Sequence, residues 1–320
     1  MLRFAALVSD GTRARILAAL EGHELAVGEL ARALALSQPR ISNHLKLLRD
    51  AGAIEARREG TWTFYRASLE GDGERAALWQ LLSRATRQEP LFRADAARRK
   101  GVLEARRRKS RAHFGSLSGK RSASGLESGL LHEELVSLLA PPGLTVVDAG
   151  CGEGHLAGTL AAHFDRVIAV DHSPARLRAA RKRVPAGNVE FLRGELDALP
   201  LPDSGADALF LSLVLHHVPD PSSVLREAHR VLRPGGRLVI AELAPHGEEW
   251  TRRALGDLRL GLDPRTLEEA LPRAGFLAPR VIPARDRLAV GRRPPLPIYL
   301  MGARRPPRPG PEPLERKQDA

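Results

Sequence analysis

The first fifty residues place apolar side chains every three or four positions, a spacing that is typical of helices with one buried face. This spacing predicts helices over residues 9–20, 27–33 and 37–50. In the third helix, Ile41, Leu45 and Leu48 share the apolar face, whereas polar and basic side chains occupy the opposite side. We therefore expect a packed three-helix unit that exposes one polar stripe.

After Ala51-Gly52 the hydrophobic period changes from helical to two, so residues 54–58 and 61–67 flank Glu59-Gly60 as a predicted β-hairpin. Three helices followed by a hairpin make a winged helix-turn-helix, in which the third helix enters the major groove of DNA and the hairpin contacts phosphates. A helical protein-interaction module with the same pattern is the alternative. The candidate DNA contacts are Gln38, Arg40, Ser42, Asn43 and Lys46 on the helix and Arg57 and Arg58 on the hairpin.

Residues 34–68 resemble the helix-turn-helix and wing of the arsenic-repressor (ArsR) family of bacterial transcriptional regulators, and the resemblance covers about residues 1–88. It implies a homodimer formed by the first and last helices, the last of which covers residues 72–86. Metal-sensing members carry two cysteines where this chain has Ala26 and Gly28. Because soft metals need thiolate ligands, no metal is expected to bind here.

From residue 144 the pattern becomes strand, glycine-rich turn, helix and strand, which predicts a βαβ unit of the nucleotide-binding type. Gly150, Gly152 and Gly154 let the backbone approach a ligand without clashes from a Cβ atom. Asp171 ends the second strand, where its carboxylate can accept hydrogen bonds from both hydroxyls of a ribose.

Two classes of ligand compete for this glycine turn. A dinucleotide needs Gly-x-Gly-x-x-Gly, but position 155 is His, and Glu153 would place a negative charge beside the pyrophosphate. Residues 148–154 instead resemble the Asp-x-Gly-x-Gly-x-Gly pattern of class I S-adenosylmethionine-dependent methyltransferases, whose cofactor carries a sulfonium cation. A nicotinamide-dependent enzyme is the alternative interpretation.

Three further segments, residues 188–203, 206–218 and 225–243, resemble the same family in the same order, and the likeness spans about residues 130–305. It implies a Rossmann-like α/β domain with a seven-stranded sheet and S-adenosylmethionine as cofactor. In such a site, Glu195 would accept from the adenine amino group and Leu196 would lie under the ring. The full set of implied cofactor contacts is Asp148, Gly150, Gly152, Gly154, Asp171, His172, Glu195, Leu196 and Ser212.

The sequence also excludes several methyl acceptors. DNA amino-methyltransferases carry an [Asp/Asn]-Pro-Pro-aromatic motif that residues 213–219 lack, and enzymes that methylate cytosine carbon 5 or arsenite need cysteines outside the glycine turn, whereas Cys151 is the only cysteine. Residues 216–219 instead resemble the small-molecule branch that includes ubiquinone and menaquinone biosynthesis enzymes. A carbon or oxygen acceptor on a small molecule is therefore expected, with no catalytic residue assigned. The substrate-side candidates are His216, His217, His246, Glu249 and Trp250.

Charge is distributed unevenly along the 320 residues, which carry 50 Lys and Arg against 38 Asp and Glu. Residues 91–121 alone hold eleven basic and two acidic side chains. These charges either contact DNA phosphates beside the winged helix or belong to a solvated linker helix. The chain has no apolar run of membrane-spanning length, no cleavable leader and one cysteine, so a cytoplasmic protein without a membrane partner is expected.

The expected multidomain organisation is a winged helix-turn-helix for DNA binding and dimerisation (1–88), a basic helical linker or lid (89–129), a class I methyltransferase domain (130–305) and a disordered tail (306–320). The favoured function is a transcriptional regulator that binds a double-stranded DNA operator, fused to a methyltransferase for a small-molecule acceptor. One alternative is a non-catalytic repressor that senses S-adenosylmethionine or S-adenosylhomocysteine. Another is a methyltransferase that uses the winged helix only to dimerise.

Overall fold

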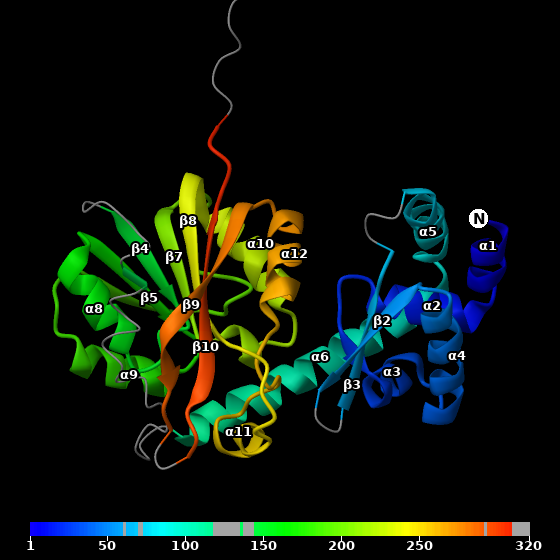
Figure 1. The fold of residues 1–320 in the computed structure, drawn as a ribbon, viewed down its shortest axis with the longest axis horizontal. Coiled ribbons are helices and arrows are strands. Elements are labelled where there is room, and N and C mark those ends of the chain that lie inside the picture. Colours follow the sequence, from blue (N-terminus) through cyan, green and yellow to red (C-terminus); the bar gives the residue numbers. More distant parts are fainter. Residues whose placement is uncertain (60–61, 70–72, 118–134, 137–143, 291–292, 309–320) are drawn as a thin grey trace, which may run out of the picture. The chain divides into compact units, whose positions relative to one another are not determined.

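The computed structural model describes residues 1–59, 62–69, 73–117, 135–136, 144–290 and 293–308 (Figure 1). Contacts within the chain divide it into two units. The first unit holds residues 1–114 together with the short segments 217–220 and 247–260, and the second unit holds the remainder. Residues 118–129 of the expected linker and 309–320 of the expected tail lie outside the described residues.

The first unit begins with four helices, α1 (Leu2–Val8), α2 (Gly11–Leu20), α3 (Val27–Leu34) and α4 (Gln38–Asp50). Helix α2 starts at Asp10, whose side chain accepts a hydrogen bond from the Arg13 amide at 2.9 Å, as an N-cap residue does. The predicted apolar faces of α2 and α4 meet in one core, where Ile16, Leu17 and Leu45 are fully buried. Helix α1 was not predicted, because its seven residues are too few to show a period.

Strands β1 (Leu25–Ala26), β2 (Ile54–Glu59) and β3 (Trp62–Ala67) form an antiparallel sheet in the order β1-β3-β2. Pairing of Ile54 with Ala67 and of Glu59 with Trp62 makes β2 and β3 the expected hairpin. The winged helix-turn-helix is thus confirmed. Helix α5 (Gly73–Thr86) follows the hairpin and buries Trp79 in the same core.

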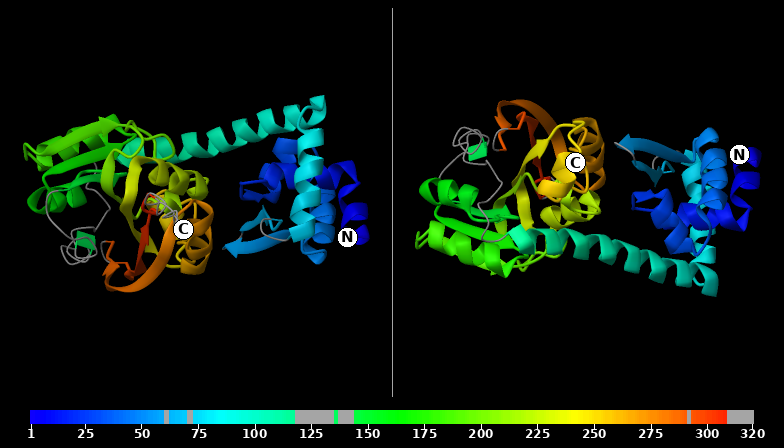
Figure 2. Two further views of the ribbon diagram at one scale, coloured as in Figure 1. Left: turned by 90° about the horizontal axis from the view of Figure 1, so that it is seen from above. Right: turned by 90° about the horizontal axis from the view of Figure 1, so that it is seen from below.

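Helix α6 (Pro90–Leu117) is a single uninterrupted helix of 28 residues, visible in Figure 2 in cyan to green. It contains most of the basic stretch that the sequence places in a linker. Neither α6 nor any other helix in the described part of the chain is long and apolar enough to cross a membrane.

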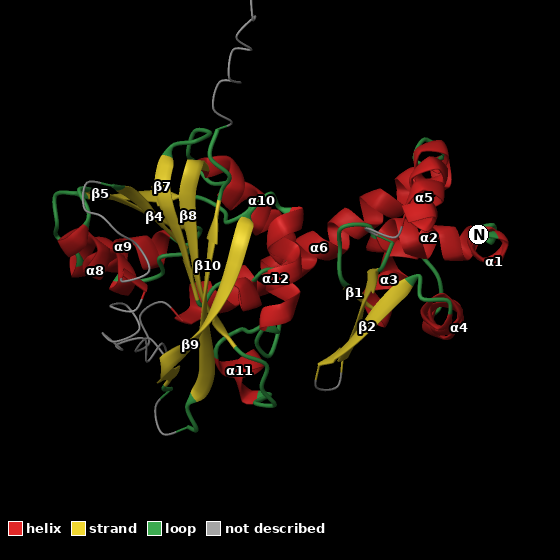
Figure 3. Cartoon of the chain, turned by 45° about the horizontal axis from the view of Figure 1, so that its top comes forward, coloured by secondary structure: helices red, strands yellow, loops and turns green. Residues whose placement is uncertain are grey.

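The second unit is built on a seven-stranded sheet in the order β6-β5-β4-β7-β8-β10-β9, in which β10 runs antiparallel to both neighbours (Figure 3). Helices α8 and α9 lie on one side of this sheet and α10 and α12 on the other. This arrangement confirms the Rossmann-like seven-stranded fold. The strands are β4 (Thr145–Ala149), β5 (Arg166–Asp171), β6 (Val189–Arg193), β7 (Ala206–Ser212), β8 (Leu232–Leu243), β9 (Leu277–Leu288) and β10 (Leu296–Arg304). The helices are α8 (His155–His163), α9 (Pro174–Arg183), η1 (Leu215–His217), α10 (Pro221–Val231) and α12 (Pro264–Arg273).

The central strands β4 and β7 are buried along almost their whole length, as expected of parallel strands that are covered on both faces. One local detail differs from the prediction. The resemblance of residues 225–243 implies a turn at Pro234-Gly235-Gly236 before the fifth strand. These residues lie within β8 instead, because Ala206 pairs with Leu232 and Ala208 already pairs with Arg237. Residues 233–236 form the resulting bulge, where Gly235 adopts a φ of +80° that favours glycine.

Candidate functional site

Two aspartates are buried near the carboxyl ends of β4 and β5, which are neighbouring parallel strands of the seven-stranded sheet. Asp148 is 1% exposed and Asp171, the last residue of β5, is 4% exposed. The carboxyl ends of parallel strands meet at one edge of a sheet, and ligands of open α/β folds bind at that edge. Both predicted carboxylates therefore belong to one site.

Asp171 fastens the glycine turn to β5. One carboxylate oxygen accepts a hydrogen bond from the Gly152 amide at 2.9 Å, and the other accepts from the Ser173 amide at 2.8 Å. The Nδ1 atom of His172 lies 3.5 Å from the same carboxylate. Because each carboxylate oxygen offers two lone pairs, Asp171 keeps acceptor capacity for the hydroxyls of a ribose.

The glycine turn has a backbone that only glycine adopts easily. Gly150, Gly152 and Gly154 have φ angles of +83°, +55° and +82°. A Cβ atom on Gly150 would lie 2.6 Å from a methyl group of Val214, so the turn packs closely against the loop that follows β7. Sequence spacing identified the glycines but not Val214, since nothing in the spacing marks a packing partner.

The electrostatics of the two aspartates favour a cationic ligand. Complete burial, together with the nearby negative charge of Asp171, raises the pKa of Asp148 to about 7. Its Oδ2 atom accepts no hydrogen bond from any described residue. A buried carboxylate with a bare oxygen beside a second carboxylate suits a ligand that carries ammonium and sulfonium groups and disfavours a pyrophosphate. The site therefore fits S-adenosylmethionine.

Three further residues implied as cofactor contacts lie at the same edge of the sheet. Leu196 follows β6, and its side chain lies 3.6 Å from the position that a Cβ atom on Gly150 would take. Glu195 forms an isolated bridge with Ala198, and Ser212 ends β7. Their roles toward adenine and the rest of the cofactor stay predictions.

A buried hydrogen-bonded pair that the sequence did not predict holds the loop after β7. His216 Nδ1 contacts the carboxylate of Glu242, and both side chains are buried. The amides of Leu215 and His216 donate to the other Glu242 oxygen at 2.9 and 3.2 Å. Leu213 in this loop has a φ of +53°, which is strained for a residue with a side chain. Glu242 thus positions His216. The one sequence signal for this contact is that Glu242 is an acidic residue near the end of an otherwise apolar stretch of β8.

The other substrate-side candidates are divided between the two units. His216 and His246 belong to the second unit, whereas His217, Glu249 and Trp250 belong to the first. His217 Nδ1 lies 3.6 Å from the buried carboxylate of Asp257. Glu249 and Trp250 lie at the start of helix α11 (Trp250–Ala254), where Trp250 Nε1 donates to Glu248 at 2.7 Å and the Glu249 carboxylate accepts from Arg252 at 3.1 Å. No catalytic role is assigned to any of them.

The polar face of α4 carries five of the candidate DNA contacts, and all five are exposed: Gln38, Arg40, Ser42, Asn43 and Lys46. The opposite face buries Ile41 and Leu48 in the core. On the hairpin, Arg58 is exposed, whereas Arg57 makes two hydrogen bonds to Glu24 at 3.0 Å each. The proposed phosphate contact of Arg57 thus competes with an internal ion pair.

Several arginines of α6 contact protein atoms instead of lying free. Arg98 donates to the Ala33 carbonyl at 3.0 Å and Arg99 to the Ala18 carbonyl at 2.8 Å, in the last turns of α3 and α2. Cations at such positions stabilise helix ends. Arg106 pairs with Glu29, whereas Lys100 and Arg108 are exposed. Part of the basic excess therefore stabilises the first unit, a role that the sequence alternatives did not include.

Family models match one segment in the predicted winged helix-turn-helix and one in the predicted methyltransferase domain. Residues 10–56 match the family model for the bacterial regulatory proteins of the arsR family, and residues 147–240 match the model for a methyltransferase domain. The relatives include a probable S-adenosylmethionine-dependent methyltransferase of Mycolicibacterium smegmatis, which is 36% identical over 39% of this chain and 50% of its own length.

Curated relatives match only part of the chain. A 37.1 kDa protein in transposon TN4556 of Streptomyces fradiae is 38% identical over 47% of this chain and 48% of its own length. Malonyl-[acyl-carrier protein] O-methyltransferase of Serratia marcescens is 39% identical over 32% of this chain and 40% of its own length. Demethylmenaquinone methyltransferase of Renibacterium salmoninarum is 36% identical over 33% and 44%. The chain thus spans about half or less of these relatives.

Among solved structures, a chain in the complex between the Haloferax volcanii Trm112 methyltransferase activator and a methyltransferase has a TM-score of 0.51 and 22% identity. The match covers 60% of this chain and 97% of that one. At this identity the likeness shows the fold alone.

Proposed function

Because the chain joins an arsR-family helix-turn-helix to a methyltransferase domain that uses S-adenosylmethionine, we propose that it is a DNA-binding transcriptional regulator that also methylates a small molecule. The observation that supports the methyl-donor half is the buried pair Asp148 and Asp171 beside the glycine turn. It is a site for a cation, and S-adenosylmethionine is cationic at physiological pH.

The residues of the site have separate roles in this proposal. Asp171 holds the ribose hydroxyls and the glycine turn together, and Asp148 faces the positively charged end of the cofactor. When bound, S-adenosylmethionine would supply a methyl group on a cationic sulfur. An acceptor carbon or oxygen would take this methyl group in line, with S-adenosylhomocysteine as the leaving group and a proton lost from the acceptor. The Glu242 and His216 pair holds the loop after β7 against the glycine turn, which keeps that edge of the sheet in one conformation.

A small-molecule carbon or oxygen acceptor is supported by sequence. Residues 213–219 lack the motif of DNA amino-methyltransferases, and a demethylmenaquinone methyltransferase is among the relatives. The DNA-binding half is supported by the exposed polar face of α4, since major-groove reading needs short polar and basic side chains that project from a rigid helix.

A homodimer is part of the proposal. Leu2 on α1 and Leu81 on α5 are 88% and 67% exposed. The resemblance to the arsR family implies a dimer formed by the first and last helices, which carry these two side chains. Leu81→Glu should halve the mass measured by light scattering and leave the helical circular dichroism unchanged. A dimer that survives both this change and Leu2→Glu would place the interface elsewhere.

The function is tested with the full-length protein in three measurements. Calorimetry measures the binding of S-adenosylmethionine, enrichment from a random duplex library measures sequence-selective DNA binding, and labelled methyl transfer into extractable products measures catalysis. All three should be positive. Binding of both ligands without methyl transfer would favour the sensing repressor, and failure to enrich any duplex would favour the dimerising role of the winged helix.

A further inference from the structure

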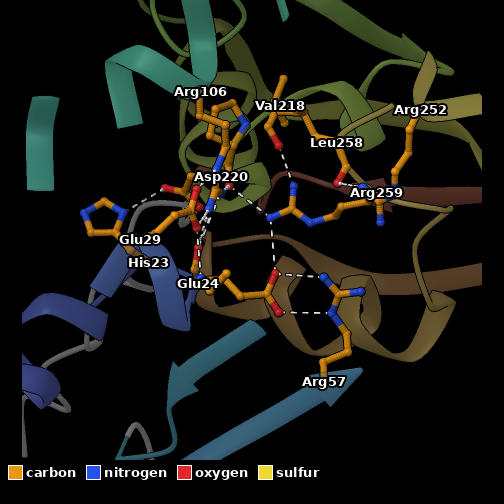
Figure 4. A network of polar contacts seen from close by, with 12 residues as sticks. His23, Glu24, Glu29, Arg57, Arg106, Val218, Asp220, Arg252, Leu258 and Arg259 are labelled. Carbon is orange, nitrogen blue, oxygen red and sulfur yellow. Dashed lines mark hydrogen bonds and ion pairs between the residues drawn. The ribbon is translucent and has the colours of Figure 1, made fainter. Parts of the chain in front are cut away.

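Glu24, which lies between α2 and β1, is held by arginines from two distant parts of the chain (Figure 4). Its carboxylate accepts two hydrogen bonds from Arg57 at 3.0 Å each and one from Arg259 Nη2 at 3.2 Å. All three residues belong to the first unit. Although burial alone would raise it, the positive charges of Arg259 and Arg57 lower the pKa of Glu24 to about 2. Glu24 therefore stays ionised at any physiological pH.

Arg259 connects Glu24 to two segments that come late in the chain. Its buried guanidinium also donates to the carbonyl groups of Val218 and Pro219, the latter at 2.9 Å. One arginine of segment 247–260 thus binds segment 217–220 and Glu24 at once. Arg106 of α6 reinforces the arrangement, because it pairs with Glu29 and lies 3.4 Å from the Pro219 carbonyl.

These two segments directly continue the loops that follow β7 and β8. Residue 217 follows His216, which Glu242 holds, and residue 247 follows His246. Strands β7 and β8 are neighbours, and ligands of this fold bind at the carboxyl ends of such strands. The segments that Arg259 binds and belongs to are therefore joined by single peptide bonds to the two loops at that edge.

Arg57, the other partner of Glu24, is one of the candidate DNA contacts. Arg57 lies on β2 of the wing, and its guanidinium lies 5.3 Å from the centre of the Phe64 ring. The two-bond fork that Arg57 offers to Glu24 is the same fork that would bind a phosphate. A stronger hold by Glu24 makes Arg57 less available to DNA.

We propose that Glu24 is a regulatory clamp that shares its charge between the wing arginine Arg57 and Arg259, so that S-adenosylmethionine or S-adenosylhomocysteine changes the affinity for DNA. The inference rests on the proposed function and names how that function is regulated. By thermodynamic linkage, DNA changes the affinity for the ligand by the same factor.

The test uses full-length protein, S-adenosylhomocysteine as a ligand that cannot transfer methyl, and a short duplex enriched from a random library by the wild type. Saturating S-adenosylhomocysteine should change the DNA dissociation constant of the wild type by about fivefold or more. In Glu24→Gln the ratio of the DNA dissociation constants with and without S-adenosylhomocysteine should be about 1. The affinity of this variant for S-adenosylhomocysteine alone should stay within about threefold of the wild-type value. The matched control is Glu55→Gln, which removes the exposed ion pair with Arg66 on the same hairpin and should keep the wild-type ratio.

A second variant tests the same clamp in case Glu24→Gln does not fold. Arg259→Lys keeps the positive charge and removes the fork that binds Glu24 and two carbonyls, so it should also lower the ratio. A folded Glu24→Gln or Arg259→Lys protein that keeps the wild-type ratio overturns the clamp, and so does a wild type that binds both ligands with a ratio of 1. A wild type that binds no duplex or no S-adenosylhomocysteine overturns the proposed function itself, and the clamp with it.

Discussion

The polar face of α4 and the carboxyl edge of the seven-stranded sheet present their candidate residues in opposite ways. On α4 the side chains are exposed, and the rigid element is the buried apolar face behind them. At the sheet edge Asp148 and Asp171 are themselves buried, and backbone amides already fix Asp171. The proposed cofactor site is thus formed before its ligand arrives, whereas DNA bound at the proposed face of α4 would have to order exposed side chains. A single substitution should accordingly cost more at the sheet edge than on the helix.

The largest effect is expected for Asp171→Ala. This change removes the proposed acceptor for the ribose and also frees the Gly152 amide. The glycine turn then keeps only its backbone bonds to β5, from the Gly150 and Cys151 amides to the Val170 carbonyl at 2.7 and 3.0 Å. Two charge-assisted hydrogen bonds are together worth about 4 kcal/mol, which corresponds to roughly a thousandfold loss of affinity for S-adenosylmethionine. Titration calorimetry measures this loss of affinity.

Asp203→Ala is the control for that experiment, because Asp203 is an exposed carboxylate that pairs with Arg230 of α10. It should bind the cofactor as the wild type does. Unchanged affinity in Asp171→Ala would show that the ligand binds elsewhere, and the comparison with α4 would lose its basis.

The paired substitution Arg40→Ala and Asn43→Ala should have the next largest effect. Both side chains are exposed on α4, and the one hydrogen bond between them and the described rest of the unit joins Arg40 to Thr12 Oγ1 at 3.3 Å, so the protein should fold and bind cofactor normally. Each base contact is worth about 1–3 kcal/mol, so DNA affinity should fall by about a hundredfold in gel shifts.

Arg49→Ala, at the end of the same helix, removes an equally exposed cation and is the control for the pair. It should leave sequence selectivity intact. If the double variant bound the enriched duplex as tightly as the wild type, the winged helix would serve dimerisation instead of DNA reading.

These two regions also show how far the sequence alone could predict the structure. The helical period, the hairpin and the glycine turn involve neighbours in sequence, and each was predicted close to its observed bounds. The links between Glu242 and His216, and between Glu24 and Arg259, join residues that are 26 and 235 positions apart. No local pattern marks such pairs, because the tertiary fold alone brings them together.

A smaller effect should come from pH, since Asp148 has a pKa of about 7 in the ligand-free protein. A cationic ligand stabilises the ionised carboxylate, so affinity for S-adenosylmethionine should rise with pH up to about 7, by at most tenfold per unit, and then level off. Calorimetry between about pH 6 and pH 8 measures this rise. A flat profile in the wild type would mean that the ligand does not meet Asp148.

Asp148→Asn is the matching variant, because it keeps the shape and removes the titration. Its affinity should not vary with pH. The sign for folding is opposite: a pKa raised from 3.8 in the folded state contributes stability at low pH that is lost as pH rises through about 7. Ligand-free Asp148→Asn should therefore melt at a higher temperature than the wild type at about pH 8.

The smallest effect on DNA affinity is expected for the basic helix α6, where some cationic side chains are exposed and others bind protein atoms. Lys100 and Arg108 are exposed, whereas Arg98 binds the Ala33 carbonyl and pairs with Asp95. Each phosphate contact contributes about 0.9 to the slope of log affinity against log salt, so Lys100→Ala with Arg108→Ala should flatten that slope by up to about 2.

Arg98→Ala should behave differently, with an unchanged salt slope and a loss of about 1 kcal/mol in the free energy of unfolding, because a hydrogen bond within the protein is removed. Fluorescence anisotropy and thermal melting measure the two quantities on the same samples. If the salt slope instead falls with Arg98→Ala and stays constant without Lys100 and Arg108, the partly buried arginines reach DNA by leaving their carbonyl partners. Exposure in the free protein would then say nothing about which α6 cations bind phosphate.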